Sequence, residues 1–258
     1  MVETITSLQN QYVKLAVQLQ IRPRARRKEG KVVLEGTRLI RDAIEQDFSP
    51  EYILYDPAQV DYDLLALLQN KWVTLYEVTS EIIQHIGDTQ NPQGIIGVFR
   101  LPKPALPDNP KRVLVLDGLR DPGNMGTILR TAGAAGVELV ILAPKCVDLY
   151  NPKVLRSGMG AHFRIPIIEA DWANIRGYCD EMNTYLASSD GDVTYSDVDW
   201  TAAWALVIGN EAHGASEEAV QFASQVVSIP MASAESLNAA IATSVLLFEA
   251  QRQRLNSH

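Results

Sequence analysis

Three segments in the C-terminal half of the chain place polar side chains and glycines directly after apolar stretches. The first, 117–131, turns at Gly123 and then has the spacing of a helix that carries Asn124 and Arg130. We expect Asn124 to cap this helix, so that the free amide groups of its first turn could hold an anion. Arg130 lies on the polar side of the helix, where it could act on a ligand or be an ordinary surface arginine.

The second segment, 207–214, is a buried strand that ends in the turn Gly209, Asn210 and Glu211. Ligands of parallel α/β sheets bind outside the carboxyl ends of the strands, where this turn is expected. The same residue types also suit ordinary turn chemistry. We expect His213 in this turn to be a bystander rather than a general base.

The third segment, 228–242, is a strand that ends at Pro230, followed by a loop of small residues and a terminal helix. Ser236 and Asn238 stand at the expected start of that helix. Their side chains and the first free amides could gather around a ligand or simply cap the helix, and these two roles are compatible.

The elements needed to position these segments follow from apolar periodicity. We predict that the second domain is a mostly parallel sheet with helices on both faces. Its predicted strands are 112–119, 138–143, 182–189, 203–209 and 225–230. Its predicted helices are 125–136, 216–224 and 235–254, and a helix followed by a strand is predicted within 151–168. A smaller α/β domain is predicted before it: helices at 4–20, 37–46, 62–70 and 79–88, and strands at 31–36, 51–56, 72–78 and 94–100. Residues 101–111 hold four prolines, which predicts an extended linker between domains at 1–100 and 112–258.

A basic run at 22–31 contrasts with the net charge of −8. The run is a solvated loop or a phosphate-binding loop, because its local positive field can bind phosphate whatever the global charge. The candidate residues for binding the phosphates of a nucleic acid are Arg22, Arg24, Arg26, Arg27 and Lys28.

Composition excludes several classes of protein. The chain has 47% hydrophobic and 21% charged residues, as ordinary folded domains do, and no apolar stretch reaches the ~18 residues that cross a bilayer. The start lacks the layout of a signal peptide, so we expect a cytoplasmic protein. Cys146 and Cys179 form no metal-ligand pattern and are predicted to be reduced structural thiols, and no metal is expected.

The three segments together resemble the signature motifs of the SpoU (TrmH-like) family of RNA ribose 2′-O-methyltransferases. The matching stretches are DPGNMGTILRTA, VIGNEAHG and IPM…SLNAAIA, in the family's order. More loosely, EGTRLIRDAI and NPQGIIGVF resemble the ribosomal-protein-like RNA-binding domain found in many members. The resemblance covers nearly the whole chain.

This resemblance implies an α/β domain with a trefoil knot, S-adenosylmethionine as cofactor, RNA as substrate and a homodimer. It assigns catalysis to Arg130 with Asn124, Glu211, Ser236 and Asn238. Arg130 would act as a base or stabilise a developing alkoxide, and the second role suits a guanidinium better. It places the cofactor against Ser188, Gly191, Ile208, Gly209, Asn210, Ile229, Met231, Leu237 and Asn238.

Ribosomal RNA is the expected substrate, with transfer RNA as the alternative. A dinucleotide-dependent enzyme would be expected to carry a G-x-G-x-x-G turn after its first strand, which this chain lacks. A non-catalytic RNA-binding protein of the same fold is the other alternative, opposed by the intact polar residues of the three segments.

Overall fold

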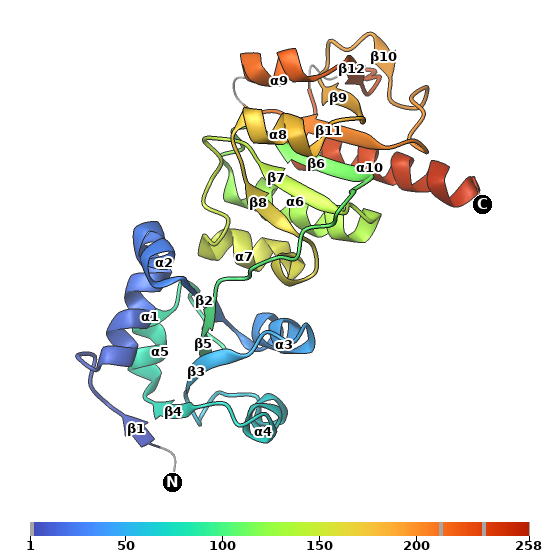
Figure 1. The fold of residues 1–258 in the computed structure, drawn as a ribbon. Helices are drawn as coiled ribbons and strands as arrows, with labels where there is room; N and C mark the ends of the chain where they lie inside the picture. The colour runs from blue at the N-terminus through green and yellow to red at the C-terminus, as the bar shows by residue number, and fades with distance from the viewer. Residues whose placement is uncertain (1–2, 212–213, 234–235, 258) are drawn as a thin grey trace. The chain divides into compact units, whose positions relative to one another are not determined.

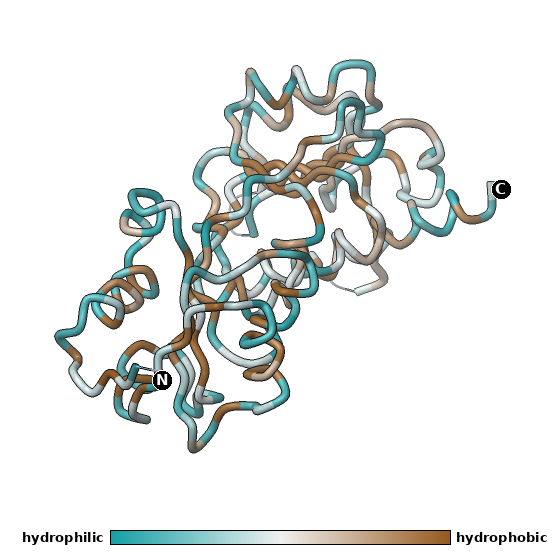
Figure 2. The backbone as a smooth tube through the Cα atoms, turned by 60° about the horizontal axis from the view of Figure 1, so that its bottom comes forward, coloured by the Kyte–Doolittle hydropathy of each residue, from teal (hydrophilic) through white to brown (hydrophobic). Residues whose placement is uncertain are grey.

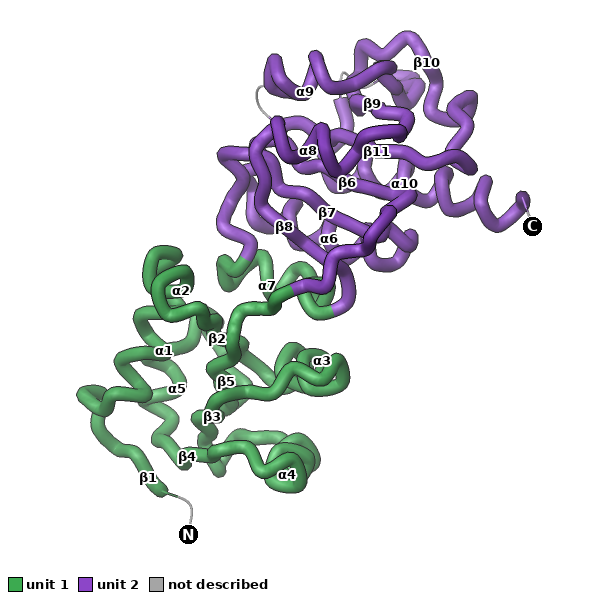
Figure 3. Tube along the Cα trace, viewed as in Figure 1, with its two compact units in different colours: residues 1–103, 150–163 green, residues 104–149, 164–258 purple. Residues whose placement is uncertain are grey.

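Two units, each with its own β-sheet, make up the computed structural model of the chain (Figures 1 and 3). The structure describes residues 3–211, 214–233 and 236–257. Unit 1 is Met1–Lys103 with Tyr150–Phe163, and unit 2 is Pro104–Leu149 with Arg164–His258. His213 lies outside the described residues.

Unit 1 alternates helices and strands in the order expected for a small α/β domain. Its elements are β1 (Glu3–Ile5), α1 (Gln11–Ile21), α2 (Pro23–Glu29), β2 (Lys31–Glu35), α3 (Thr37–Glu45), β3 (Pro50–Tyr55), α4 (Tyr62–Asn70), β4 (Leu75–Val78), α5 (Ser80–Ile86), β5 (Ile95–Arg100), α7 (Pro152–Gly158) and the 3-10 turn η1 (Ala161–Phe163). The sheet order is β1-β4-β3-β5-β2, and only β5 runs against its neighbours.

Both faces of this sheet are buried, because alternate residues of each strand point to opposite sides. In β3, Ile53 packs in a cluster with residues of α3 and α4, whereas Leu54 packs with residues of α1 and α5. In Figure 2, which colours the chain by residue hydropathy, hydrophobic segments (brown) lie mostly inside and hydrophilic segments (teal) mostly at outer turns.

Residues 150–163 depart from the predicted division of the chain into 1–100, a linker and 112–258. They group with unit 1 although the sequence places them between elements of unit 2 (Figure 3). Leu155 and Phe163 belong to the same buried cluster as Ile40 and Leu64, and this burial explains the assignment. Linear sequence gives no sign of such an exchange, because the apolar spacing of α7 is compatible with either core.

Unit 2 is built on β6 (Arg112–Leu116), α6 (Pro122–Ala135), β7 (Leu139–Leu142), β8 (Ile167–Glu169), α8 (Trp172–Tyr178), β9 (Asn183–Ala187), β10 (Val193–Thr194), β11 (Trp204–Ile208), α9 (Glu217–Phe222), β12 (Gln225–Ser228) and α10 (Ala239–Asn256). The sheet order is β10-β12-β9-β11-β6-β7-β8, and every pairing among the described strands is parallel. The expectation of a mostly parallel α/β sheet is therefore confirmed.

Helices cover both faces of this sheet (Figure 1). Ile175 of α8 and Phe222 of α9 pack in one cluster with Val113 and Val207 of the strands. On the opposite face α6 packs along α10, where the hydroxyls of Thr131 and Ser244 are 3.4 Å apart. From β6 the chain runs outward to β7 and β8, and it later returns to place β11 on the other side of β6. The ends of β6 and β11 thus form the switch point at which α/β sheets bind ligands.

Several local predictions were wrong. The basic run is a helix, α2, because Pro23 provides a favourable first position and Gly30, at φ +62°, ends it. Residues 3–5 form a strand paired with β4 and not the start of a helix. The terminal helix begins at Ala239, not at residue 235, and the sequence reading missed α8 and β10.

Asp121, and not Asn124, is the N-cap of α6. Its carboxylate accepts a hydrogen bond from the backbone N–H of Asn124 at 2.7 Å. Pro122 then occupies the first position of the helix, where a missing N–H costs nothing. The side chain of Asn124 is left available for other contacts.

Among the described residues, no helix combines the length and apolar character needed to span a bilayer. The two cysteines, Cys146 and Cys179, form no disulfide in the described part of the chain. Burial raises the pKa of the Cys146 thiol to about 11 and that of Cys179 to about 12, so both are neutral at physiological pH. This burial agrees with the prediction of reduced, structural thiols, which stays a prediction.

Candidate functional site

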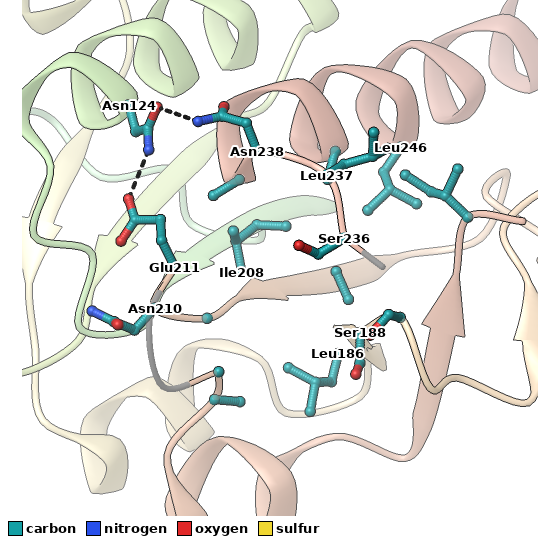
Figure 4. A pocket seen from close by; sticks show the side chains of 18 of the residues that line it. Asn124, Leu186, Ser188, Ile208, Asn210, Glu211, Ser236, Leu237, Asn238 and Leu246 are labelled. Carbon is teal, nitrogen blue, oxygen red and sulfur yellow. Dashed lines mark hydrogen bonds between the residues drawn. The ribbon is translucent and has the colours of Figure 1, made fainter. Parts of the chain in front are cut away.

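A cavity of about 770 Å³ opens at the carboxyl ends of β9, β11 and β12, beside the first turns of α6 and α10 (Figure 4). The three chemistry-bearing segments of the sequence meet there. The expected site residues that line it are Asn124, Ser188, Ile208, Gly209, Asn210, Glu211, Ile229, Met231, Ser236, Leu237 and Asn238.

Asn124 links the three segments through its side-chain amide (Figure 4). Its Nδ2 donates to Oε1 of Glu211 at 2.9 Å, and its Oδ1 accepts from Nδ2 of Asn238 at 3.0 Å. The Oδ1 of Asn238 caps α10 by accepting from Ala240 N at 2.9 Å. One chain of hydrogen bonds thus fixes the orientation of both amides and of the Glu211 carboxylate.

The turn after β11 is held by β6 at the switch point. Asp117, 4% exposed, accepts a hydrogen bond from Ser216 N at 2.6 Å, and Asn210 Nδ2 donates to the carbonyl of Gly118 at 2.6 Å. Gly209 is required by packing, because a Cβ there would lie 2.8 Å from Ala215 N. These contacts place Glu211 at the cavity before any ligand binds.

Much of the remaining lining of the cavity is apolar. Leu186, Val220, Val227 and Leu246 line it together with Ile208. Pockets of 300–1,000 Å³ with apolar walls and a few fixed polar groups are typical sites for small molecules. The described residues hold no group of three or more His, Cys, Asp or Glu that could bind a metal ion.

The donor set and size of this cavity fit S-adenosylmethionine. Its apolar wall suits the adenine ring, the hydroxyls of Ser188 and Ser236 suit the ribose and amino-acid groups, and the Glu211 carboxylate suits a positive charge. The chemistry of the lining therefore agrees with the cofactor that the sequence motifs imply.

Two expected site residues do not line the cavity. Arg130 is exposed on α6, six residues and about 9 Å along the axis from Asn124, and it makes no hydrogen bond or ion pair within the described residues. The position of Gly191 is explained by packing, because a Cβ there would lie 2.7 Å from the carbonyl carbon of Val227 in β12.

Arg120 was missed by the sequence reading. It is exposed, lines the cavity one residue before the Asp121 cap, and pairs with no group in the described part of the chain. The rule that pointed to the carboxyl end of β6 could have found it, since it lies in the same turn. The apolar wall was also missed, because its residues come from strand and helix interiors where burial is the default explanation.

Comparison with known proteins gives two family matches that together span most of the chain. Residues 111–248 match the SpoU rRNA Methylase family, and residues 10–97 match the MRM3-like substrate binding domain. The chain belongs to the SpoU rRNA methylase family. Members of this family are RNA methyltransferases with S-adenosylmethionine as methyl donor, and this chain is one of them.

SpoU-family relatives match the chain over nearly its full length. The mouse "rRNA methyltransferase 3, mitochondrial" is 35% identical over 88% of this chain and 69% of its own length. The Bacillus subtilis "23S rRNA (guanosine(2553)-2′-O)-methyltransferase RlmP" is 30% identical over 95% of this chain and 97% of its own. An AdoMet-bound rRNA methyltransferase structure from Sinorhizobium meliloti superposes with a TM-score of 0.86 at 32% identity, covering 97% of this chain and 98% of that one.

Proposed function

We propose that this chain methylates a ribose 2′-hydroxyl of ribosomal RNA. The observation that carries the proposal is the hydrogen-bonded chain Glu211–Asn124–Asn238 at the edge of a cofactor-sized cavity in a SpoU-family fold. Relatives named as ribosomal RNA methyltransferases in mouse and Bacillus subtilis support ribosomal RNA over transfer RNA.

The cofactor would lie in the cavity of unit 2. Leu186, Ile208 and Val227 would bury the adenine ring, and Ser188, Met231 and Leu237 would surround the remainder. When bound, S-adenosylmethionine supplies an electrophilic methyl group on a positively charged sulfur. The task of the protein is then mainly to align this methyl group with the ribose oxygen and to exclude water.

The hydrogen-bonded residues Glu211, Asn124 and Asn238 would orient the ribose of the substrate. Asn124 holds the Glu211 carboxylate in place, which keeps a negative charge at the cavity edge. A ribose hydroxyl needs help to lose its proton, and a nearby guanidinium favours the developing alkoxide. Within this chain Arg120 is the guanidinium that lines the cavity. For Arg130 we propose a place at the cavity of a second copy of the chain.

A homodimer is part of the proposal. Ile241, Phe248 and Leu255 are 55%, 49% and 65% exposed on α10 and are spaced by seven residues, so they lie on one side of the helix. An exposed apolar stripe of this kind favours burial against another chain, and a two-fold dimer would cover it twice.

RNA affinity is assigned to the substrate-binding domain. Arg22, Arg24, Arg27 and Lys28 are exposed on or beside α2 and would contact phosphates. Arg26 is removed from the expected set, because it is 2% exposed and its guanidinium donates to the backbone carbonyls of Leu19 and Gln20.

Two further expectations stay with the proposal. A cytoplasmic location is proposed because bacterial ribosomal RNA, the substrate named for the Bacillus subtilis relative, is in the cytoplasm, whereas the mouse relative is named mitochondrial. The trefoil knot implied by the family motifs is proposed for unit 2.

The decisive experiment incubates the purified full chain with methyl-labelled S-adenosylmethionine and separated ribosomal and transfer RNA from a strain that lacks the gene. We expect label in ribosomal RNA, resistant to alkaline cleavage at one nucleotide, as a 2′-O-methyl group is. Label in transfer RNA alone would show that transfer RNA, and not ribosomal RNA, is the substrate. Label on a base would refute ribose methylation, and no transfer to either RNA would refute the proposed activity.

A further inference from the structure

Among the described residues, Trp72 is the most exposed of the large apolar side chains, at 95%. It follows α4 in unit 1, while Trp200 and Trp204 are buried and Trp172 is half-buried against Phe222. Tryptophan carries the largest apolar surface of any side chain, so full exposure forgoes a large stabilising contribution. Nothing in the fold of unit 1 requires this side chain.

The backbone at Trp72 adds a second cost. Val73 N donates to the carbonyl of Leu68 and Trp72 N to that of Gln69, which is the Schellman pattern that ends α4. Its left-handed position is taken by Trp72, at φ +58°. Glycine takes the left-handed position after α2 and α6, and aspartate takes it after α3. A bulky residue there is strained.

Positively charged side chains lie at the end of the sheet near Trp72. β2, β3 and β4 are mutually parallel and β5 is antiparallel to β2 and β3, so the first residues of β2, β3 and β4 lie at the same end of the sheet as the last residue of β5. Lys31 and Arg100 lie at this end, and Glu51 pairs with Lys31 at 2.7 Å and Arg100 at 3.0 Å. The Arg100 side chain is 83% exposed. Lys71 and Trp72 come shortly before β4, and β3 lies between β4 and β5 in the sheet.

We propose that Trp72 is a stacking platform for an unpaired nucleobase of the RNA substrate, with Lys71 and Arg100 contacting the adjoining phosphates. An aromatic face beside cations is the arrangement that binds single-stranded nucleic acid, since every base has a face to stack and every linkage carries a negative charge. An aromatic side chain retained in a strained, fully exposed position is explained by this contact. The proposal rests on the proposed RNA substrate and adds a binding site in unit 1, apart from the cavity of unit 2.

The test uses the intrinsic fluorescence of the full chain. A single-stranded RNA of about ten nucleotides and mixed sequence is titrated into the wild type and into W72F, W72A and W72G. Stacking on RNA should quench the wild-type emission. W72F should keep most of the affinity but lose the quenching, whereas W72A and W72G should bind at least about fivefold more weakly.

W72G separates binding from stability. Glycine suits the left-handed position, so its melting temperature should rise by about 2–4 °C while its affinity for RNA falls. A destabilised variant that binds weakly because it unfolds would show the opposite shift. Tyr62→Ala is the matched control, since Tyr62 is 66% exposed at the other end of α4 and should leave RNA affinity unchanged.

Wild-type affinity in W72A, or quenching that persists in W72F, would overturn the proposal. A wild-type emission that changes with protein concentration and not with RNA would also overturn it, because Trp72 would then contact a second chain. Methyl transfer by the wild type is measured in parallel. Active wild type with unaltered W72A binding refutes only the stacking site, whereas RNA binding without methyl transfer refutes only the proposed function.

Discussion

Asn124 bonds with both ends of its amide to side chains of the other two site segments, Glu211 and Asn238. It can donate to Glu211 and accept from Asn238 only because Asp121 has taken over the capping of α6. An aspartate cap one turn earlier thus converts an expected structural residue into a candidate for orienting substrate. The two arginines differ in their position, because Arg120 lines the cavity and Arg130 does not.

Replacing Asn124 by alanine should lower the rate of methyl transfer about tenfold or more, because the Glu211 carboxylate loses the bond that orients it. The loss of two hydrogen bonds should cost about 2 kcal/mol of stability. Initial rates at saturating cofactor and chemical unfolding would measure both effects. Asn174→Ala is a matched control, because Asn174 is exposed on α8 and bonds only to its neighbour Asp171. Equal rates in the two variants would contradict the assignment.

Arg130→Ala should abolish methyl transfer while leaving cofactor affinity by calorimetry nearly unchanged, because the proposed role of Arg130 is toward the ribose hydroxyl and not toward the cofactor. Arg120→Gln should keep a measurable rate with an efficiency toward RNA about tenfold lower, because one charge contact to substrate is worth roughly that much. Turnover retained in Arg130→Ala would refute its catalytic role. Loss of cofactor binding in Arg120→Gln would move Arg120 from the substrate to the cofactor.

At the scale of elements, the strand ends of unit 2 are positioned by close backbone contacts. The loop after β9 passes so near β12 that Gly191 has no room for a side chain. This contact sets the separation between the loop that carries Ser188 and the strand that leads to Ile229, both at the cavity. Gly191 therefore shapes the site through packing and not by touching a ligand.

Gly191→Ala should separate the two segments and weaken both the fold and cofactor binding. A Cβ 2.7 Å from a backbone carbon forces a shift, and overpacking of this kind costs about 1–3 kcal/mol. Gly177→Ala on α8 is the control, because nothing lies within 4 Å of the added methyl group and alanine favours a helix. Thermal unfolding and calorimetry with S-adenosylmethionine would test this. A Gly191 variant as stable as the wild type would show that the loop yields freely.

At the scale of the whole molecule, each unit carries a surface feature that its own fold leaves uncovered and that can be tested in solution. Unit 1 has the exposed basic residues of α2, and unit 2 has the apolar stripe of α10. Charge and apolar surface call for different partners, RNA for the first and a second chain for the second. The two features can therefore be tested by different variables, salt and protein concentration.

RNA binding should weaken steeply with salt, and glutamine at Arg22, Arg24, Arg27 and Lys28 should reduce the slope of log affinity against log salt. Four phosphate contacts to single-stranded RNA correspond to a slope change of about 3. Filter binding across a salt series measures it. Arg26→Ala should instead lower stability with the slope unchanged, since its guanidinium is buried against backbone carbonyls. An unchanged slope in the fourfold variant would show that the cations of α2 do not contact RNA phosphates.

The Phe248→Glu variant should be monomeric by light scattering and inactive when dilute, because a charge in an apolar interface is costly to bury. Tyr178→Glu is the control, at a 37% exposed aromatic side chain that ends α8 on the other face of the sheet. A wild type that is monomeric and active at the same dilution would show that methyl transfer does not require a second chain.

Sequence alone determined the order of most strands and helices, the three segments of the site and the family. These depend on local periodicity and on contiguous motifs, which a linear reading detects directly. Only the tertiary structure decided that residues 150–163 join unit 1, that Arg26 is buried and that Arg120 rather than Arg130 lines the cavity. The physical reason is common to all three: burial and reach depend on neighbours distant in the chain, and no pattern of spacing records which core a helix face will meet.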